Sequence, residues 1–140
     1  MRNINDILKQ CKVIEVVGDG NQTVSGLAFD SRKCSDEMAF FAIKGTQVDG
    51  HDFIDKVIEQ GCKVIVCEHI PSAIVDEVTY YVVDNTAKSL GYAASEFYGR
   101  PSEKIRLVGV TGTNGKTTIA TLLYRLILNA GYPCGFLSTI

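Results

Sequence analysis

The sequence has little of what marks membrane, secreted or nucleic-acid-binding proteins. No apolar run approaches the roughly 20 residues that a membrane-spanning helix requires. The formal net charge of −2 gives no basic excess, so nothing indicates a nucleic-acid-binding surface. The first residues lack the apolar stretch and the cleavage site of a signal peptide. We therefore expect a cytoplasmic protein that binds neither membranes nor nucleic acid.

Cysteines suited to disulfides or metals are also scarce. The five cysteines include no Cys-x-x-Cys pair and their number is odd, so we expect reduced thiols and no disulfide framework. The tightest cluster of possible metal ligands is Cys62, Cys67 and His69. Because Cys67 ends an apolar run, it is better explained as a small buried hydrophobe than as a ligand.

What the chain does have is an alternation of strand and helix patterns without internal repeats, which predicts an α/β fold. Hydrophobic residues make up 46% of the 140 positions, enough for one well-buried core. The patterns predict helices at residues 5–11, 52–60 and 86–98, and strands at residues 13–17, 24–29, 38–43, 64–67 and 80–83.

The third of these helices has a full apolar stripe, formed by Leu90, Ala93, Ala94, Phe97 and Tyr98. Gly-Arg-Pro-Ser at positions 99–102 then breaks the pattern, since proline disfavours helix at the preceding residue. We therefore expect one domain in residues 1–99, a linker in 100–104 and the start of a second domain in 105–140.

The second part begins with a buried-type strand at residues 105–110, followed by a glycine-rich loop and an amphipathic helix that ends at Gly131. One face of this helix carries Ile119, Leu122, Leu123, Leu126, Ile127 and Ala130. The apolar segment 136–140 reads as the start of a further strand.

The loop has the composition of a phosphate-binding loop: Gly112, Thr113, Asn114, Gly115, Lys116, Thr117 and Thr118. Its glycines allow backbone N–H groups to approach phosphate oxygens, and the helix N-terminus behind them adds further donors. Lys116 would contact the terminal phosphates of ATP during catalysis, and the Thr117 hydroxyl would bind Mg²⁺. Val110 stands where the usual pattern has glycine. A plain glycine turn with a solvated lysine is the alternative.

This shifted-glycine loop resembles the ATP loop of the Mur ligases and of folylpolyglutamate synthase. Residues 29–33, Phe-Asp-Ser-Arg-Lys, and residues 40–54 are similar to the N-terminal domain of the Mur ligases that add the third amino acid. Residues 64–68 fit the same domain, so the resemblance covers essentially the whole chain. It implies a UDP-sugar-binding N-terminal domain, then the first strand, loop and helix of a P-loop ATPase domain that is truncated.

The resemblance implies an ATP- and Mg²⁺-dependent carbon–nitrogen ligase of peptidoglycan precursor synthesis. The carboxylate of UDP-N-acetylmuramoyl-L-Ala-D-Glu becomes an acyl phosphate, and the amine of diaminopimelate or lysine displaces the phosphate. The full-length protein is expected to be a monomer. The fragment alone is expected to be inactive, because the magnesium carboxylates and the amino-acid pocket would lie downstream.

By motif position, the resemblance places the UDP-sugar contacts on Phe29, Ser31, Thr46, Gln47 and Val48, with backbone rather than side-chain contact expected at Thr46. The residues alone leave open whether Asp30 and Ser31 only form a turn or cap. A turn that leads into a helix fully explains residues 49–51, so His51 is not expected to be a catalytic acid or base.

Two alternatives remain. The ligase that adds D-alanyl-D-alanine has a similar N-terminal domain, but its phosphate loop usually lacks the Thr-Asn pair found at Thr113 and Asn114. The other alternative is a stand-alone UDP-sugar-binding module, against which the end of the chain inside an apolar segment argues.

Overall fold

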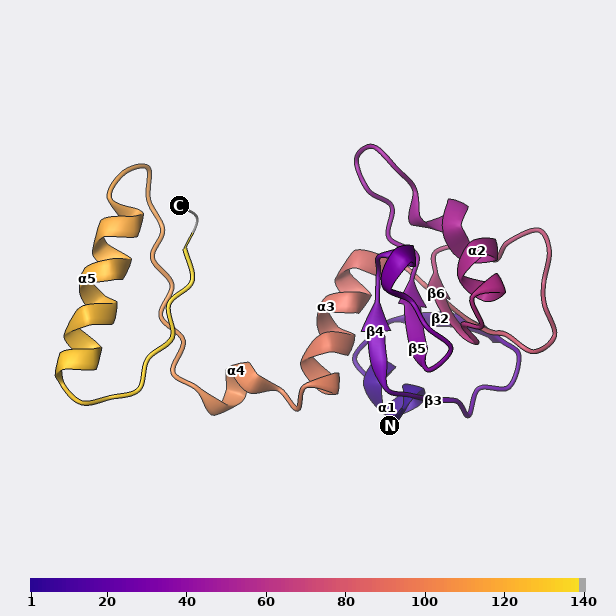
Figure 1. The fold of residues 1–140 in the computed structure, drawn as a ribbon, viewed down its shortest axis with the longest axis horizontal. Helices are drawn as coiled ribbons and strands as arrows, with labels where there is room; N and C mark the ends of the chain where they lie inside the picture. Colours follow the sequence, from indigo (N-terminus) through magenta and orange to yellow (C-terminus); the bar gives the residue numbers. More distant parts are fainter. Residues whose placement is uncertain (139–140) are drawn as a thin grey trace. The chain divides into compact units, whose positions relative to one another are not determined.

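The computed structural model describes residues 1–138 and divides the chain into two compact units, Met1–Lys104 and Ile105–Ile140 (Figure 1). Thr139 and Ile140, part of the strand expected at 136–140, lie outside the described residues. None of the helices in the described part of the chain is long and apolar enough to cross a membrane.

The first unit is built on a five-stranded sheet with the order β2-β7-β6-β5-β4. Strands β4 to β7 run parallel to one another, whereas β2 pairs antiparallel with β7 at the edge. The register places Ala28, Phe40, Ile65 and Tyr80 in one row across the parallel strands. The strands are β2 (Val13–Val17), β4 (Gly26–Ala28), β5 (Met38–Phe41), β6 (Val64–Cys67) and β7 (Thr79–Val83).

Both faces of the sheet are buried at the central strands β5, β6 and β7, which explains why these strands are apolar at successive positions rather than alternating with polar residues. One face packs against the helices α1 (Ile4–Leu8) and α3 (Thr86–Phe97), and its core includes Phe41, Val66 and Tyr81. The other face packs against α2 (Ile54–Glu59), and its core includes Phe40, Ile65, Cys67 and Tyr80. The unit is therefore a three-layer α/β fold, and the predicted fold class is confirmed.

The helix α3 begins where two side chains cap it. Asn85 Oδ1 accepts from the Lys88 N–H at 2.7 Å, and Glu68 Oε1 accepts from the Thr86 N–H at 2.9 Å. Its apolar stripe is only partly the one predicted. Ala93 is buried, but Tyr98 lies beyond the last helical residue and is 72% exposed.

Residues 24–29, predicted as one strand, form parts of two. Strand β3 (Thr23–Val24) pairs with β1 (Arg2–Asn3) in a small antiparallel sheet, whereas β4 pairs with β5 in the main sheet. The prediction of a single strand was wrong because the chain changes its pairing strand at Ser25. The periodicity of a sequence does not indicate which strand a segment pairs with. The short helices η1 (Ser31–Lys33), η2 (Gly50–Phe53) and α4 (Pro101–Lys104) complete the unit.

The second unit contains the helix α5 (Lys116–Asn129), which Gly131 follows in a left-handed conformation with φ +84°. Residues 105–110 form no strand, contrary to the prediction, and neither do residues 136–138. A strand exists only through backbone hydrogen bonds to a neighbouring strand, and no described segment of this unit pairs with either stretch. None of the described side chains in the unit is buried, and Leu122 is 61% exposed.

Candidate functional site

The first unit has a cavity of about 480 Å³ where the parallel strands β4 and β5 end. Ligands of parallel α/β sheets characteristically bind outside the carboxyl ends of the strands, because the loops there converge. The cavity is lined by Phe29, Asp30, Ser31, Arg32, Ile43, Val48, Gly50, Phe53 and Lys56.

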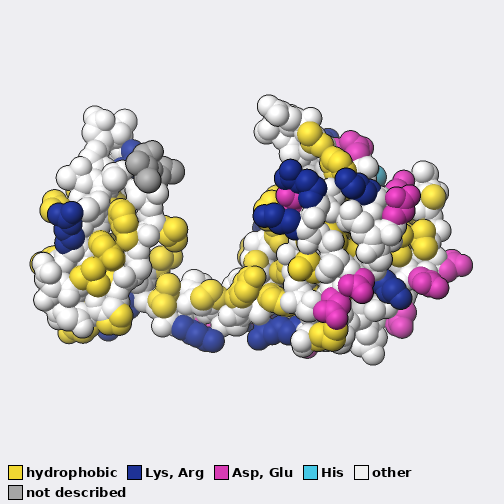
Figure 2. Space-filling view, in the orientation of Figure 1, with side chains coloured by type: hydrophobic (Ala, Val, Ile, Leu, Met, Phe, Trp, Pro, Cys, Tyr) yellow, Lys and Arg dark blue, Asp and Glu magenta, His cyan; other side chains and the backbone are white. Residues whose placement is uncertain are grey.

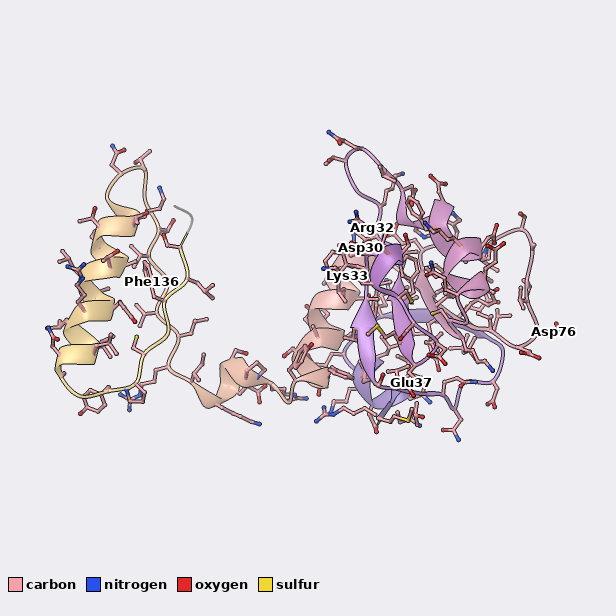
Figure 3. All side chains as sticks on the ribbon, in the orientation of Figure 1. Asp30, Arg32, Lys33, Glu37, Asp76 and Phe136 are labelled. Atoms are coloured by element: carbon pink, nitrogen blue, oxygen red, sulfur yellow. The ribbon has the colours of Figure 1, made fainter. Side chains whose placement is uncertain are left out.

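Directly after β4, Asp30 starts the short helix η1 and fixes the side chain of Arg32 (Figure 3). The Arg32 N–H donates to Asp30 Oδ1 at 3.1 Å, and the guanidinium donates to both carboxylate oxygens at 2.9 and 2.8 Å. These hydrogen bonds from Arg32 lower the pKa of Asp30 to about 2. The carboxylate is therefore ionised at neutral pH and serves as a cap.

The same turn leaves Ser31 in a different situation. Its side chain is largely buried, with the residue 8% exposed, and it lines the cavity. Among the described residues 1–138, the Ser31 hydroxyl has no hydrogen-bond partner. A hydroxyl at a cavity wall without a protein partner is free to hydrogen-bond a ligand. Asp30 therefore caps the turn, while the adjacent Ser31 is available to a ligand.

The loop after β5 closes the other side of the cavity. An isolated antiparallel β-bridge pairs the backbones of Lys44 and Asp49, and the Gly50 N–H donates to the Ile43 carbonyl at 2.8 Å. A Cβ on Gly50 would lie 2.5 Å from the Ile43 nitrogen, so only glycine allows this close approach. Val48, at the base of the loop, lines the cavity.

The structure therefore brings together three of the five side chains expected to contact the UDP-sugar: Phe29, Ser31 and Val48. Thr46 and Gln47 are exposed in the same loop but do not line the cavity. As contacts to a UDP-sugar, all five remain predictions.

The sequence analysis did not propose the lining residues Ile43, Gly50, Phe53 and Lys56 as site residues, and the last two are the informative ones. Phe53 lies on the apolar face of the predicted helix, where it looks like a core residue, and Lys56 looks like an ordinary solvated charge. Only the position of α2 beside η1 brings them to the cavity. With Arg32, Lys56 gives the cavity two cations, and Figure 2 shows lysine and arginine side chains gathered in this part of the first unit.

His51 lies next to the cavity, but both of its ring nitrogens are hydrogen-bonded within the protein. Asp49 Oδ1 accepts from the His51 N–H at 3.0 Å and from Nδ1 at 2.6 Å, while Nε2 accepts from the Glu68 N–H at 2.9 Å. The first of these bonds is the main cause of the lowered pKa of Asp49. The ring also stacks on His69, with centroids 4.1 Å apart. His51 thus fixes the loop between β5 and α2 to the end of β6.

The glycine loop of the second unit folds back over its lysine. Lys116 Nζ donates to the carbonyls of Gly112 and Thr113, at 2.5 and 3.2 Å. Gly112 and Gly115 have φ of +149° and +76°, values that strongly favour glycine. The ammonium thus lies against the loop although the side chain is exposed, and Lys116 is the first residue of α5, whose first-turn N–H groups lack intrahelical partners. Thr117 follows the lysine, and its hydroxyl accepts a hydrogen bond from the Ser138 hydroxyl at 3.4 Å. Phosphate binding by this loop remains a prediction.

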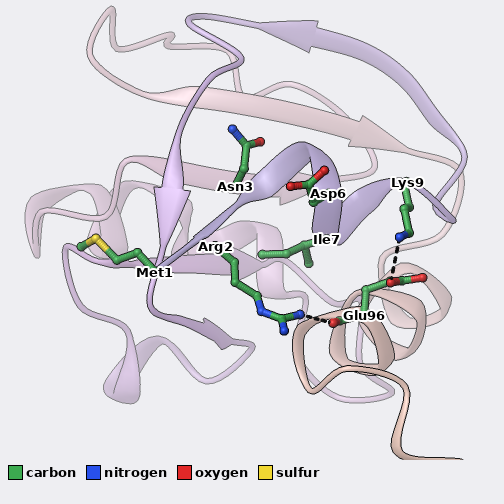
Figure 4. A pocket seen from close by; sticks show the side chains of 7 residues that line it. All are labelled: Met1, Arg2, Asn3, Asp6, Ile7, Lys9 and Glu96. Atoms are coloured by element: carbon green, nitrogen blue, oxygen red, sulfur yellow. Dashed lines mark hydrogen bonds and ion pairs between the residues drawn. The ribbon is translucent and has the colours of Figure 1, made fainter. Parts of the chain in front are cut away.

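A second hollow in the first unit, of about 340 Å³, lies between the N-terminus, α1 and the end of α3 (Figure 4). Two of its cations already bind Glu96. Arg2 donates to the Glu96 carbonyl at 2.5 Å, and Lys9 Nζ lies 3.2 Å from Glu96 Oε2. We therefore regard these residues as structural.

The chain is similar in sequence to a known protein family and to curated proteins. The model of the Mur ligase family, catalytic domain, matches residues 23–98. The curated UDP-N-acetylmuramoyl-L-alanyl-D-glutamate–2,6-diaminopimelate ligases of Phocaeicola vulgatus and Cytophaga hutchinsonii are 47% and 45% identical over 98% of the chain. The chain spans only 28% of the length of these relatives.

Two solved structures share the fold. A crystal structure of MurF from Acinetobacter baumannii has a TM-score of 0.69 and 24% identity, covering 91% of this chain and 28% of that one. MurF ligase from Thermotoga maritima, solved in complex with ADP, has a TM-score of 0.54 and 30% identity, covering 74% of this chain and 23% of that one.

Proposed function

The chain belongs to the Mur ligase family, and from this premise we propose that it forms the UDP-sugar-binding domain and the start of the ATP-binding domain of a third-amino-acid-adding ligase. The reaction joins an amino acid to UDP-N-acetylmuramoyl-L-Ala-D-Glu in peptidoglycan precursor synthesis in the cytoplasm. Because the relatives are named as diaminopimelate ligases, we propose diaminopimelate rather than lysine. The observation that carries the proposal is the hollow at the ends of β4 and β5, lined by Phe29, Ser31 and Val48, in a chain 47% identical to a diaminopimelate ligase.

In the cavity, each lining group suits one part of a UDP-sugar. Phe29 is 64% exposed, and its ring and that of Phe53 offer flat apolar surfaces for the uracil. The free hydroxyl of Ser31 is placed to hydrogen-bond the nucleoside. Lys56 supplies positive charge for a diphosphate, and the Arg32 guanidinium, which is paired with Asp30, adds hydrogen-bond donors. Thr46 and Gln47 contribute through the backbone of their loop.

In the second unit, Gly112 to Thr118 would hold the triphosphate of ATP, and the Thr117 hydroxyl would be a ligand of Mg²⁺. ATP supplies the phosphoryl group that the substrate carboxylate takes up, with release of ADP; the amine then attacks the acyl carbon and releases phosphate. Lys116 stabilises the negative charge on the transferring group, because its ammonium is held at the loop by the carbonyls of Gly112 and Thr113.

The D-alanyl-D-alanine-adding ligase is the second candidate, because the solved neighbours are of that type. Their identity to this chain, 24% to 30%, is well below the 47% of the diaminopimelate ligase relative. The order of these identities favours the third-amino-acid reaction.

A ligase assay on the protein extended to the length of its relatives tests the proposal. ADP release and a new UDP-linked product are expected with UDP-N-acetylmuramoyl-L-Ala-D-Glu, ATP, Mg²⁺ and diaminopimelate. Lysine is the matched amine control. Turnover that requires the UDP-linked tripeptide and D-alanyl-D-alanine would instead establish the second candidate.

A further inference from the structure

The segment between β5 and α2 supplies three of the residues that line the cavity: Ile43, Val48 and Gly50. Residues 44–49 form its tip, which we call the cavity loop. In the described chain, the hydrogen bonds of the cavity loop reach no residue outside 43–52. The Gly45 N–H, for example, donates to the Val48 carbonyl at 2.9 Å. The loop is therefore closed on itself, and its attachment to the next strand of the sheet depends on a residue beyond it.

The ring of His51 makes this attachment. Its side chain is only 7% exposed, and Nδ1 lies 2.6 Å from Oδ1 of Asp49, the last residue of the cavity loop. On its other side, Nε2 accepts from the N–H of Glu68, directly after β6, at 2.9 Å. Glu68 is itself fixed, because its Oε1 accepts from the N–H and the hydroxyl of Thr86 at 2.9 and 3.1 Å. The ring thus joins the cavity loop to a fixed end of the sheet.

The two partners of the ring define where its proton lies. The Glu68 N–H can only donate a hydrogen bond, so Nε2 has to be the nitrogen without a proton. The Asp49 carboxylate can only accept, so Nδ1 carries the proton. The attachment of the loop therefore requires a neutral imidazole in one tautomer. A second proton on the ring, which histidine side chains typically take up between about pH 8 and 5, removes this state.

A second proton would affect the two hydrogen bonds in opposite ways. The bond from Nδ1 to Asp49 would remain, because a cationic donor strengthens a hydrogen bond to a carboxylate. At Nε2, the new N–H would face the Glu68 N–H, so two donors would meet and this bond would be lost. The ring would stay on the cavity loop and be released from β6.

The other charged or titratable groups around the ring do not replace the lost bond. His69 stacks on His51 with ring centroids 4.1 Å apart, so its nitrogens lie beside the ring and not in line with Nε2. Lys44, which pairs with Asp49 in the β-bridge, is a cation and has no acceptor in its side chain. The Glu68 carboxylate accepts from Thr86.

We propose that His51 is the positioning residue of the cavity: its neutral ring holds the cavity loop against the end of β6, and its protonation releases the loop and weakens ligand binding. His51 does not itself line the cavity, so it acts through Ile43, Val48 and Gly50, which do. The identity of the ligand, a UDP-sugar, rests on the proposed function.

Nitrogen-15 NMR of the ligand-free 140-residue chain tests the ring without any ligand. At pH 7.5, His51 should be protonated on Nδ1 and unprotonated on Nε2. As the pH is lowered to 5, the backbone amides of Val48 and Glu68 should shift with the same midpoint as the His51 ring. A neutral ring protonated on Nε2, or amides of Val48 and Glu68 that do not follow the ring, would overturn the proposal.

Calorimetric titration of the same chain with UDP-N-acetylmuramoyl-L-Ala-D-Glu at pH 7.5 and 5.5 measures the effect on binding. The wild-type Kd should rise by about 2- to 12-fold at the lower pH, as for the loss of one hydrogen bond. His51→Gln keeps an amide oxygen that can accept from the Glu68 N–H and does not titrate, so it should bind equally at both pH values. His51→Ala should bind weakly at both.

The matched control is His69→Phe, which keeps a flat ring on His51 and should retain the wild-type dependence on pH. The sequence contains no histidine besides these two, so the variants separate their effects. Far-ultraviolet circular dichroism at both pH values verifies that each variant is folded.

A His51→Gln variant with the wild-type pH dependence, or a wild-type affinity that stays constant while the His51 ring titrates, would contradict the positioning role. Absence of wild-type binding at both pH values would instead refute the UDP-sugar assignment, and the ligand-free titration would then decide the role of His51 by itself.

Discussion

At the scale of residues, Asp30 and Ser31, which are neighbours in the turn after β4, have different roles. The Asp30 carboxylate accepts hydrogen bonds from the backbone and the side chain of Arg32, whereas Ser31 lines the cavity and its hydroxyl has no partner in the described chain. The sequence motif could not separate these roles, because both side chains are typical of turns. The hydrogen bonds in the structure separate the role of Asp30 from that of Ser31.

Ser31→Ala should weaken UDP-sugar binding and leave ATP binding unchanged. Removal of the hydroxyl leaves a ligand group poorly paired and costs roughly 1–3 kcal/mol. That corresponds to about 5- to 150-fold in Kd. Calorimetric titration of each ligand separately provides the measurement.

The matched control is Ser72→Ala, since Ser72 is an exposed serine away from the cavity. An equal loss of ATP and UDP-sugar affinity in Ser31→Ala would mean that Ser31 supports the fold. No change in either would assign the contact to other groups of the cavity.

Lys116→Ala should lower kcat by at least about 10²-fold in the protein extended to the length of its relatives, because one preorganised transition-state contact is lost. The thermal midpoint should hardly move, since the side chain is exposed and contacts only loop carbonyls. Steady-state kinetics with the diaminopimelate reaction checks this. A variant with near-normal kcat would show that the loop is only a turn.

At the scale of elements, residue patterns placed strands well where a β-branched run is bounded by turn residues. Strands β2, β6 and β7 begin and end within one residue of the predicted positions, although only β6 and β7 are buried throughout and β2 is largely exposed. The prediction of a strand at 105–110 was wrong, because an apolar run indicates that a segment can be buried but not that a neighbouring strand is present to pair with it. The cavity was predicted only in part, because α2 brings Phe53 and Lys56 to it through packing.

Glu96 joins three elements of the first unit. Its carboxylate lies 2.7 Å from the guanidinium of Arg100 and 3.2 Å from Lys9, and it accepts a hydrogen bond from Gln10. Arg100 follows α3 with a left-handed φ of +53°, which is unfavourable without glycine. Hydrogen bonding to Arg100 is the main cause that lowers the pKa of Glu96 from 4.5 to about 2.

A pH dependence follows from Glu96. Since its pKa is lower in the folded state, its contribution to stability is complete above about pH 4.5 and is lost as the pH falls toward 2. Chemical unfolding of wild type and Glu96→Gln between pH 2 and 6 provides the measurement. The wild type should be more stable at pH 6, and the difference should shrink toward pH 2. A difference independent of pH would contradict the ion-pair account.

At the scale of the whole molecule, the two units differ in how they are held together. The first unit buries two core clusters on the two faces of its sheet. The described residues of the second unit bury none, although Tyr124 and Phe136 stack at 5.5 Å. The glycine loop at residues 112–118 thus has its left-handed backbone positions in a unit that buries no described side chain.

Hydrogen exchange should reveal this difference. Backbone amides of β5, β6 and β7 should exchange slowly, because they lie in the centre of a covered sheet. Amides of α5 should exchange faster by orders of magnitude in the same sample of the 140-residue chain. Equal protection of α5 and β6 would contradict the account of the second unit.

The central claim is that the cavity at the ends of β4 and β5 holds the UDP end of the substrate, apart from the ATP loop. Chemical-shift mapping of the ¹⁵N-labelled chain tests it most directly. UDP-N-acetylmuramoyl-L-Ala-D-Glu should shift the amides of Phe29, Ser31, Val48 and Lys56 and leave residues 112–118 unchanged. Shifts centred on residues 112–118, or none around the cavity at saturating ligand, would contradict the account.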